Sequence, residues 1–146
     1  MLYLLGEEDR IVGISGFTVR PPRARKEKPK VSAFTSAKIQ KILDLEPDLV
    51  LGFSDLQADI AAELIRHGIN VYIFNQRSVA EILSMICQLG ALVGAGDRAL
   101  AFVQDIEQRI DERRTKVASM PRRPRVYFEE WNDPLITGIR WVAELV

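Results

Sequence analysis

Two kinds of segment alternate along the first two-thirds of the chain. Short, continuous apolar runs of strand length occur at residues 9–15, 48–53 and 69–74. Such runs are typical of strands that are buried on both faces of a sheet. Segments with apolar residues at helical spacing follow them, at residues 36–48, 54–68 and 78–94. Strand–helix alternation with short turns predicts βαβ units, a mainly parallel sheet and the α/β fold class.

The ends of the predicted helices carry recognisable signals. Ser78 and Glu81 form the S-x-x-E pattern of a capping box, and Gly68 stands where a glycine ends a helix. A long amphipathic helix is predicted over residues 97–120 and would be about 35 Å long. Its expected apolar stripe consists of Leu100, Val103, Ile106, Ile110 and Val117.

Both ends of the chain lack expected neighbours. The chain starts on a predicted helix with no strand before it, and it stops in a helix that has just begun at residues 141–146. A strand predicted at residues 125–130 has no obvious sequential partner. This pattern suggests that the sequence is cut at both ends.

Composition narrows the class of protein. The 146 residues contain 20 basic and 20 acidic side chains, so the chain as a whole is not a polyanion binder and no nucleic-acid partner is expected. Cys87 is the single cysteine and is predicted to be a buried, inert thiol. The N-terminus has no basic region and only a short apolar run, so no signal peptide is expected in this chain.

No set of residues predicts catalysis or metal binding. His67, the one histidine, lies at the end of a predicted helix, where it would be solvated or help to cap it. A metal site needs several clustered ligands, and one histidine and one cysteine 20 residues apart do not predict one. Glu129 and Glu130 are neighbours in a predicted strand and would point to opposite faces, so they cannot form one dyad. The chain is therefore expected not to be an enzyme, with no catalytic residue, metal or cofactor.

Residues 15–36 form a basic segment with three open interpretations. It contains six basic residues and a single acid, Glu27. It could be an ordered, solvated loop, a nucleic-acid patch, or the wall of a cleft for an anionic ligand or an acidic partner. Phe17, Phe34 and Phe53 favour the cleft, because Phe17 and Phe53 lie at the ends of predicted strands and Phe34 lies in the loop before a predicted helix. Ligands bind at the carboxyl ends of strands in open parallel sheets. Arg20 would lie on the same rim.

The motifs "DRIVGISGFTVRPP", "PKVSAFTSAKIQKILDLEPDLVLGFSD" and "GINVYIFNQRSVAEIL" resemble the periplasmic substrate-binding proteins of the vitamin B12 and ferric-siderophore ABC importers. The resemblance continues through residues 123–146. It implies a truncated two-lobe fold: a parallel-sheet, three-layer lobe (residues 1–95), a long inter-lobe helix (96–120) and the beginning of a second lobe (121–146). Roughly the second half of such a protein would be missing.

The resemblance also assigns residues to roles. Aromatic side chains at Phe17, Phe34 and Phe53 would line the ligand cleft, with a weaker contribution from Trp131 of the second lobe. Arg20 replaces a tyrosine of B12-binding members, which favours a carboxylate- or catecholate-bearing ferric chelate over a neutral corrin. Gln40 stands where the family presents a glutamate to the membrane permease.

The implied function is that of a solute-binding component of an ABC importer, or a fragment of one. Its ligand would be a ferric siderophore or a corrinoid such as vitamin B12, its partner an ABC permease, and its location periplasmic or extracellular. The alternative is a non-transport interaction protein that keeps the lobe without a functional cleft. Such a protein could form a homodimer by exchanging residues 121–146.

Overall fold

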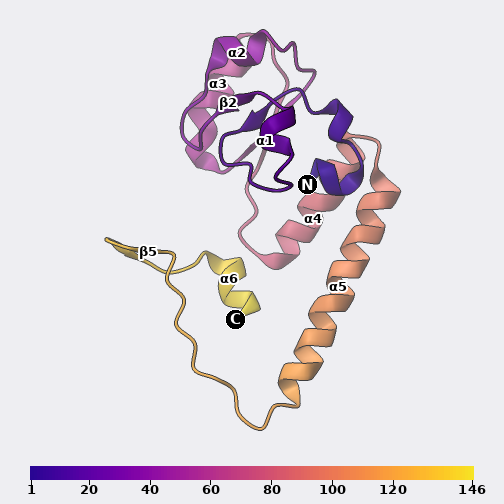
Figure 1. The fold of residues 1–146 in the computed structure, drawn as a ribbon, viewed down its shortest axis with the longest axis vertical. Coiled ribbons are helices and arrows are strands. Elements are labelled where there is room, and N and C mark those ends of the chain that lie inside the picture. Colours follow the sequence, from indigo (N-terminus) through magenta and orange to yellow (C-terminus); the bar gives the residue numbers. More distant parts are fainter. The chain divides into compact units, whose positions relative to one another are not determined.

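The computed structural model describes all 146 residues, which divide into two compact units, Met1–Asn75 (unit 1) and Gln76–Val146 (unit 2). Strands pair in parallel in unit 1 and a long helix dominates unit 2, so the predicted α/β class is confirmed. Figure 1 shows the path of the chain through both units. The expected division at residues 95 and 120 stays a prediction.

The strands of unit 1 form two parallel pairs, where the sequence predicts one continuous sheet. They are β1 (Ile14–Ser15), β2 (Lys30–Ser32), β3 (Val50–Phe53) and β4 (Val71–Phe74). β1 pairs with β2 through an irregular register, and β3 pairs with β4 in register over all four residues. The strand predicted at residues 9–15 is thus shorter than expected, because residues 8–10 turn into a 3-10 helix.

Six short helical segments surround these strands. They are η1 (Leu2–Leu5), η2 (Glu8–Arg10), α1 (Ala24–Glu27), α2 (Ile39–Leu43), η3 (Asp55–Gln57) and α3 (Ala58–Arg66). The helix expected over residues 36–48 has only the five residues of α2, because the chain turns at Leu45 and Glu46 takes a left-handed conformation (φ 45°). The basic segment is not a plain loop, since it contains α1 and β2.

The core of unit 1 draws one or two apolar side chains from most of its elements. The buried apolar residues are Leu5, Ile14, Ala24, Ile42, Ala61, Leu64 and Phe74. Leu64 lies on the apolar face of α3, and Phe74 ends β4. Burial of such side chains stabilises a fold by about 1.5–3 kcal/mol each for the larger ones.

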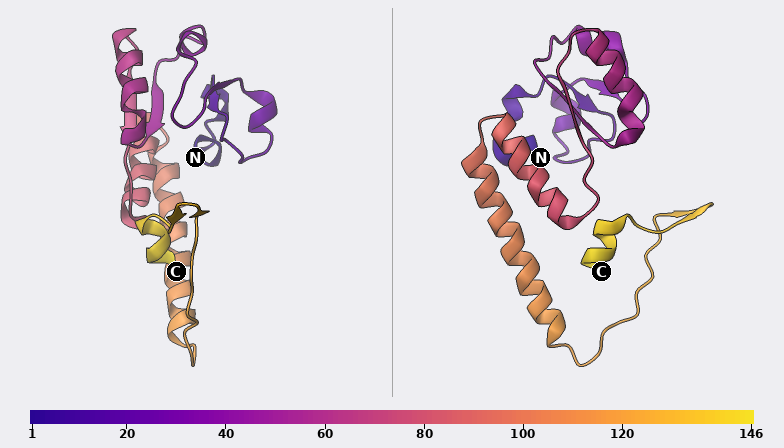
Figure 2. Two further views of the ribbon diagram at one scale, coloured as in Figure 1. Left: turned by 90° about the vertical axis from the view of Figure 1, so that its left-hand side faces the viewer. Right: turned by 180° about the vertical axis from the view of Figure 1, so that it is seen from behind.

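Unit 2 is built on two helices that lie side by side, α4 (Val79–Leu92) and α5 (Gly96–Ala118), as both views in Figure 2 show. The predicted capping box is confirmed: Ser78 Oγ accepts from the backbone N–H of Glu81 at 3.2 Å, and the Glu81 carboxylate accepts from Ser78 N at 2.9 Å. None of the helices in either unit combines the length and apolar character that a membrane-spanning segment requires.

The predicted apolar stripe of α5 is only partly buried. Ala99 and Val103 are buried, whereas Leu100 and Val117 are 52% and 42% exposed. α5 continues well beyond the end of α4 (Figure 2), and residues 111–118 are all exposed. Leu100 and Val117 therefore belong to the apolar stripe by their spacing but lie on the exposed surface of α5.

The segment after α5 differs from its prediction. No strand forms at residues 125–130, because this proline-bounded segment finds no partner strand. A small antiparallel hairpin forms instead from β5 (Trp131–Asn132) and β6 (Leu135–Ile136). The final helix, α6 (Arg140–Leu145), is the one that the sequence predicts at the C-terminus.

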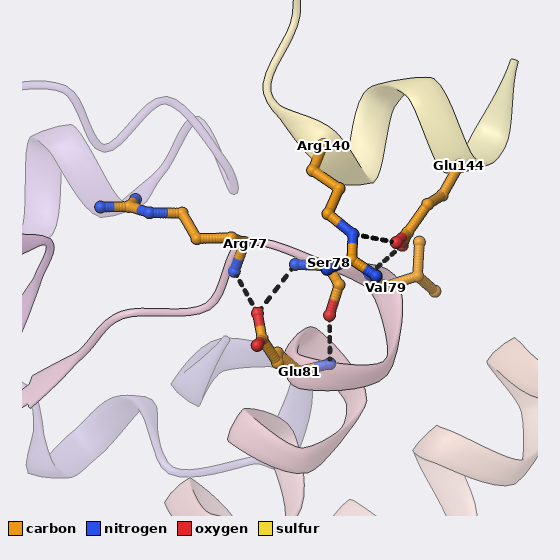
Figure 3. Close-up of polar contacts among 6 residues, drawn as sticks. All are labelled: Arg77, Ser78, Val79, Glu81, Arg140 and Glu144. Atoms are coloured by element: carbon orange, nitrogen blue, oxygen red, sulfur yellow. Dashed lines mark hydrogen bonds and ion pairs between the residues drawn. The ribbon is translucent and has the colours of Figure 1, made fainter.

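α6 docks on the N-terminus of α4 through polar contacts (Figure 3). Glu144 Oε2 accepts from the backbone N–H of Val79 at 2.7 Å, and Glu144 Oε1 accepts from Arg140 Nε at 2.8 Å. The backbone N–H of Trp141 also donates to the carbonyl of Arg77 at 3.0 Å. The first N–H groups of a helix have no intrahelical acceptor, so a carboxylate there is stabilising. The hydrogen bond from Val79 and the contact with Arg140 lower the pKa of Glu144.

We expect Gly90→Ala to destabilise the protein. A Cβ at Gly90 would overlap the Cβ of Ala99 and lie 3.1 Å from the Ala95 carbonyl oxygen. This overpacking outweighs the helix-propensity gain, so a net loss of about 1–2 kcal/mol should appear in denaturant unfolding. Gly96→Ala is the matched control, since nothing lies within 4 Å of its added Cβ. A Gly90→Ala variant as stable as that control would contradict the close approach of α4 and α5.

We expect the docking of α6 to weaken in acid. Because the folded-state pKa of Glu144 is lowered, its contribution is present above the ordinary glutamate pKa of about 4.3 and is lost as the pH falls through the folded value. In a Trp131→Phe background, Trp141 fluorescence should change below about pH 4. Glu144→Gln should resemble the acid form at pH 7, and Glu107→Gln should behave as the parent. Identical titrations for the Glu144→Gln and parent proteins would contradict this role.

Candidate functional site

The carboxyl ends of the strands in unit 1 bring two aromatic side chains together. The ring centroids of Phe34 and Phe53 are 6.5 Å apart, with the rings tilted by 43°. Phe53 is the last residue of β3, and Phe34 lies two residues beyond β2, in a tight turn that the Ala33 N–H closes on the Ser36 carbonyl at 2.8 Å. Phe34 is 38% exposed. The prediction that these two residues share one rim agrees with this contact.

Gln57 connects the backbones that carry the two rings. Its Nε2 donates to the Phe34 carbonyl at 2.8 Å, and its Oε1 accepts from the backbone N–H of Phe53 at 2.8 Å. The sequence analysis missed this residue. A signal was present, because Ser54 and Gln57 match the S-x-x-Q form of a capping box. In the structure the glutamine reaches Phe53 N, while the N–H of Ser54 donates to the Phe74 carbonyl at 2.8 Å.

The chain leaves β3 through a sharp turn at Ser54. Ser54 is buried and takes φ 79°, ψ 149°, a region that few non-glycine residues adopt. Its Oγ accepts from the N–H of Leu56 at 3.4 Å and donates to Asp55 at 2.9 Å. Gly52 is required on this side, because a Cβ there would overlap Ile73 and lie 2.9 Å from Gln57 Oε1.

Phe17 and Arg20 follow the end of β1 but do not join the ring pair. The backbone N–H of Phe17 donates to Ser15 Oγ at 3.2 Å, while its ring is 69% exposed and contacts no other ring. Arg20 is exposed, and its side chain forms no hydrogen bond or ion pair. Gly16 N donates to the Ser32 carbonyl at 2.7 Å, so the end of β1 lies beside the end of β2. Phe17 therefore follows a strand end that lies beside the strand end before Phe34, whereas Arg20 comes five residues after β1.

Part of the basic segment is neutralised within unit 1. Arg23 pairs with Glu8 at 2.8 Å and with Glu27 at 3.5 Å, and its guanidinium lies 5.0 Å from the centroid of the Tyr3 ring. The hydrogen bond from Arg23 lowers the pKa of Glu8, and the same contact raises the pKa of Arg23. Arg23 thus ties α1 to the N-terminal segments, and Arg20, Arg25 and Lys26 keep unpaired charges.

The two remaining candidates, Trp131 and Gln40, form their hydrogen bonds with residues outside the ring pair. Trp131 belongs to unit 2, where its indole Nε1 donates to the Asp133 carbonyl at 2.9 Å and the side chain is 60% exposed. Its part in a ligand site stays a prediction. Gln40 is exposed on α2, and its Nε2 donates to Asp44 at 2.8 Å. The amide therefore carries a carboxylate beside it, one turn further along the helix.

The histidine, the cysteine and the paired glutamates lie in separate parts of the chain. No group of three or more His, Cys, Asp or Glu side chains is placed to hold a metal ion. His67 is exposed at the end of α3, with Nε2 3.4 Å from Glu63. Cys87 is half-buried on α4, more exposed than the fully buried thiol that the sequence predicts. Glu129 accepts a hydrogen bond from the Tyr127 hydroxyl at 2.9 Å.

Comparison with known proteins identifies the family of the chain. A family model described as "Periplasmic binding protein" matches residues 1–146. The chain belongs to the periplasmic binding protein family. The vitamin B12-binding protein of Vibrio vulnificus is 26% identical over 146 residues, which are 98% of this chain and 53% of that protein. This chain thus spans about half the length of the curated relatives that it matches.

Solved structures share the fold of this family member. The periplasmic vitamin B12 binding protein BtuF of Vibrio cholerae superposes with a TM-score of 0.77 at 26% identity, over 93% of this chain and 53% of that one. A possible iron-binding (periplasmic solute-binding) protein from Staphylococcus epidermidis gives a TM-score of 0.79 at 21% identity, over 91% and 53%. The latter likeness shows the fold alone.

We expect Arg23→Met to raise the pKa of Glu8 toward the ordinary glutamate value of about 4.3. The stability that Arg23 gives through Glu8 is present above that value and is lost as the pH falls through the folded pKa. The stability difference between parent and variant should therefore shrink in acid. Carboxyl NMR titration measures the pKa, and Arg25→Met is the control. An unchanged Glu8 titration would show that the ion pair does not form in solution.

Proposed function

We propose that this chain is the solute-binding part of an ABC importer and captures a metal chelate, either a ferric siderophore or a corrinoid. The observation that carries the proposal is the Phe34–Phe53 pair at the strand ends, together with the unpaired charge of Arg20 five residues beyond β1. The coverage of the whole chain by the family model supports it. The chain would act by binding and delivery, without catalysing a reaction.

The aromatic pair suits a flat or aromatic ligand. Its rings are tilted by 43° and 6.5 Å apart, so they do not stack face to face on each other. Phe34, at 38% exposure, keeps part of its surface for a ligand, and Phe17 offers a further exposed ring at the end of β1. Contacts of this kind combine burial of apolar area with the favourable geometry of aromatic stacking. They serve a corrin ring and an aromatic chelate equally well.

Arg20 separates the two ligand classes. An arginine side chain without an internal partner can hold a carboxylate or catecholate through paired N–H donors. A neutral corrin has no anionic group of this kind for the arginine to bind. The charge therefore favours an anionic ferric chelate, whereas the 26% identity to a vitamin B12-binding protein favours a corrinoid. Both ligands stay within the proposal.

Delivery would take place at a membrane permease in the periplasm. Gln40 occupies the position at which the family presents a glutamate, and Asp44 lies beside it at hydrogen-bonding distance. A carboxylate on this exposed helix face would steer the encounter with permease arginines and affect mainly its rate and orientation. The Gln40–Asp44 pair could supply that charge from the next turn of α2.

The direct test of the proposed function is co-elution of coloured ligands with the protein. Gel filtration with light scattering would be run with excess cyanocobalamin, and separately with a ferric tricatecholate. Either colour in the protein peak would support a working site, and its absorbance would identify the ligand class. Colourless peaks for both ligands would contradict the proposal that this chain captures them.

We expect Arg20→Ala to lower the affinity for the ferric tricatecholate at least about tenfold, which corresponds to about 1.4 kcal/mol, and to leave cyanocobalamin binding unchanged. The reason is that the variant removes a charge and leaves the aromatic surface intact. Absorbance titration measures both constants. Arg25→Ala is the matched control, since Arg25 is another exposed, unpaired cation of the same segment. Equal losses for both ligands would show that charge recognition is not the role of Arg20.

A further inference from the structure

We propose that Gln57 is the positioning residue of the aromatic pair: it holds Phe34 and Phe53 at their spacing and thereby sets the affinity of the stacking surface. The inference rests on the proposed function for its ligand and on the hydrogen bonds of Gln57 for its geometry. Gln57 would not touch the chelate through its amide, because both polar atoms of that amide are engaged by the protein.

The two hydrogen bonds define the orientation of the amide. Oε1 faces an N–H donor, on Phe53, and Nε2 faces a carbonyl acceptor, on Phe34, each at 2.8 Å. Exchanging oxygen and nitrogen would place donor against donor and acceptor against acceptor. The Gln57 side chain therefore joins the end of β3 to the turn at Phe34, which lies 23 residues before Gln57 in the chain.

Gln57 and Phe53 both belong to regular secondary structure. Gln57 closes η3 and directly precedes α3, and its own N–H donates to the Ser54 carbonyl at 3.1 Å. Phe53 belongs to the in-register pair of β3 and β4. The turn that carries Phe34 is the less constrained partner, because Ala33 and Ser36 close it outside the strands. The bridge thus fixes the turn against the strand.

Glutamine is the residue type that this position demands. A glutamate has the same length and could still accept from Phe53 N, but it could not donate to the Phe34 carbonyl. A methionine has a similar length and would make neither hydrogen bond. Gly52 leaves the space that the amide uses, since a Cβ there would lie 2.9 Å from Gln57 Oε1. The series Gln, Glu, Met therefore removes the two hydrogen bonds one after the other.

The consequence for binding is preorganisation. A ring that is already held at its bound position loses little freedom when a ligand stacks on it, whereas a mobile ring must be ordered at the expense of affinity. Without the bridge, the turn at Phe34 would sample several positions and the rings would lose their fixed spacing. We expect Gln57→Met to lower the affinity for the coloured ligand about tenfold. The affinity of Gln57→Glu should lie between those of Gln57→Met and the parent.

The test combines a measurement without ligand and one with it. In the free protein, proton NOEs between the Phe34 and Phe53 rings should be present in the parent, weaker in Gln57→Glu and absent in Gln57→Met. The Phe53 amide proton should shift upfield in Gln57→Met and stay nearly in place in Gln57→Glu. Gln108→Met is the matched control, because Gln108 is an exposed glutamine in unit 2 that donates to Glu112.

The outcomes separate this inference from the proposed function. Persistent ring NOEs in a folded Gln57→Met protein would overturn it, and so would lost NOEs with unchanged affinity for cyanocobalamin and the ferric tricatecholate. If the parent protein binds neither ligand, the proposed function fails and the NOE series still decides whether Gln57 positions the rings. If Gln57→Met does not fold, Gln57→Glu, which keeps one hydrogen bond, supplies the same comparison.

Discussion

The parallel pairing of β3 with β4 is the constraint on which the candidate site depends. Four residues of each strand pair in register, and the N–H of Ser54 extends the pairing to the Phe74 carbonyl. This pairing decides where β3 stops and therefore where Phe53 is presented. The chain then turns at Ser54, in a conformation rare for a residue with a Cβ, and enters η3. Because that turn is tight, Gln57 comes back within reach of Phe53 and of the turn at Phe34.

Some basic side chains of residues 15–36 form ion pairs within the fold, and others are unpaired. Arg23 is engaged by two carboxylates and a tyrosine ring, and it holds α1 against the N-terminal segments. Arg20 has no such partner. A count of positive charges along the sequence treats these arginines as equivalent, although only unpaired ones can meet an anionic ligand. The interpretation of the segment as a cleft rim therefore rests on the unpaired charge of Arg20 and on the Phe34–Phe53 ring pair.

Unit 2 is held together by the packing of α4 against α5 and by the polar contacts of α6 with the start of α4. α4 and α5 approach each other closely at Gly90 and Ala99, Ala99 and Val103 of α5 are buried, and residues 111–118 are exposed. α6 returns to the N-terminus of α4, where Glu144 accepts a hydrogen bond from the Val79 N–H and the capping box already uses Glu81. Two carboxylates at one helix start match the positive end of the helix dipole. The chain spans about half the length of its matched relatives.

Local patterns in the sequence determined the fold class, the strands at β3 and β4, the capping box and the long helix, because these depend on residues close together in the chain. They also pointed to Phe53, since strand ends can be located from apolar runs, and to Phe34 in the loop before a predicted helix. Tertiary structure alone decided that the strands form two pairs, that residues 125–130 form no strand, and that Arg23 is paired while Arg20 is not. It likewise decided the role of Gln57, whose S-x-x-Q pattern suggests only a local cap. The hydrogen bond between Arg23 and Glu8 joins residues 15 positions apart, and that between Gln57 and Phe34 joins residues 23 positions apart. A local sequence pattern cannot predict contacts over such separations.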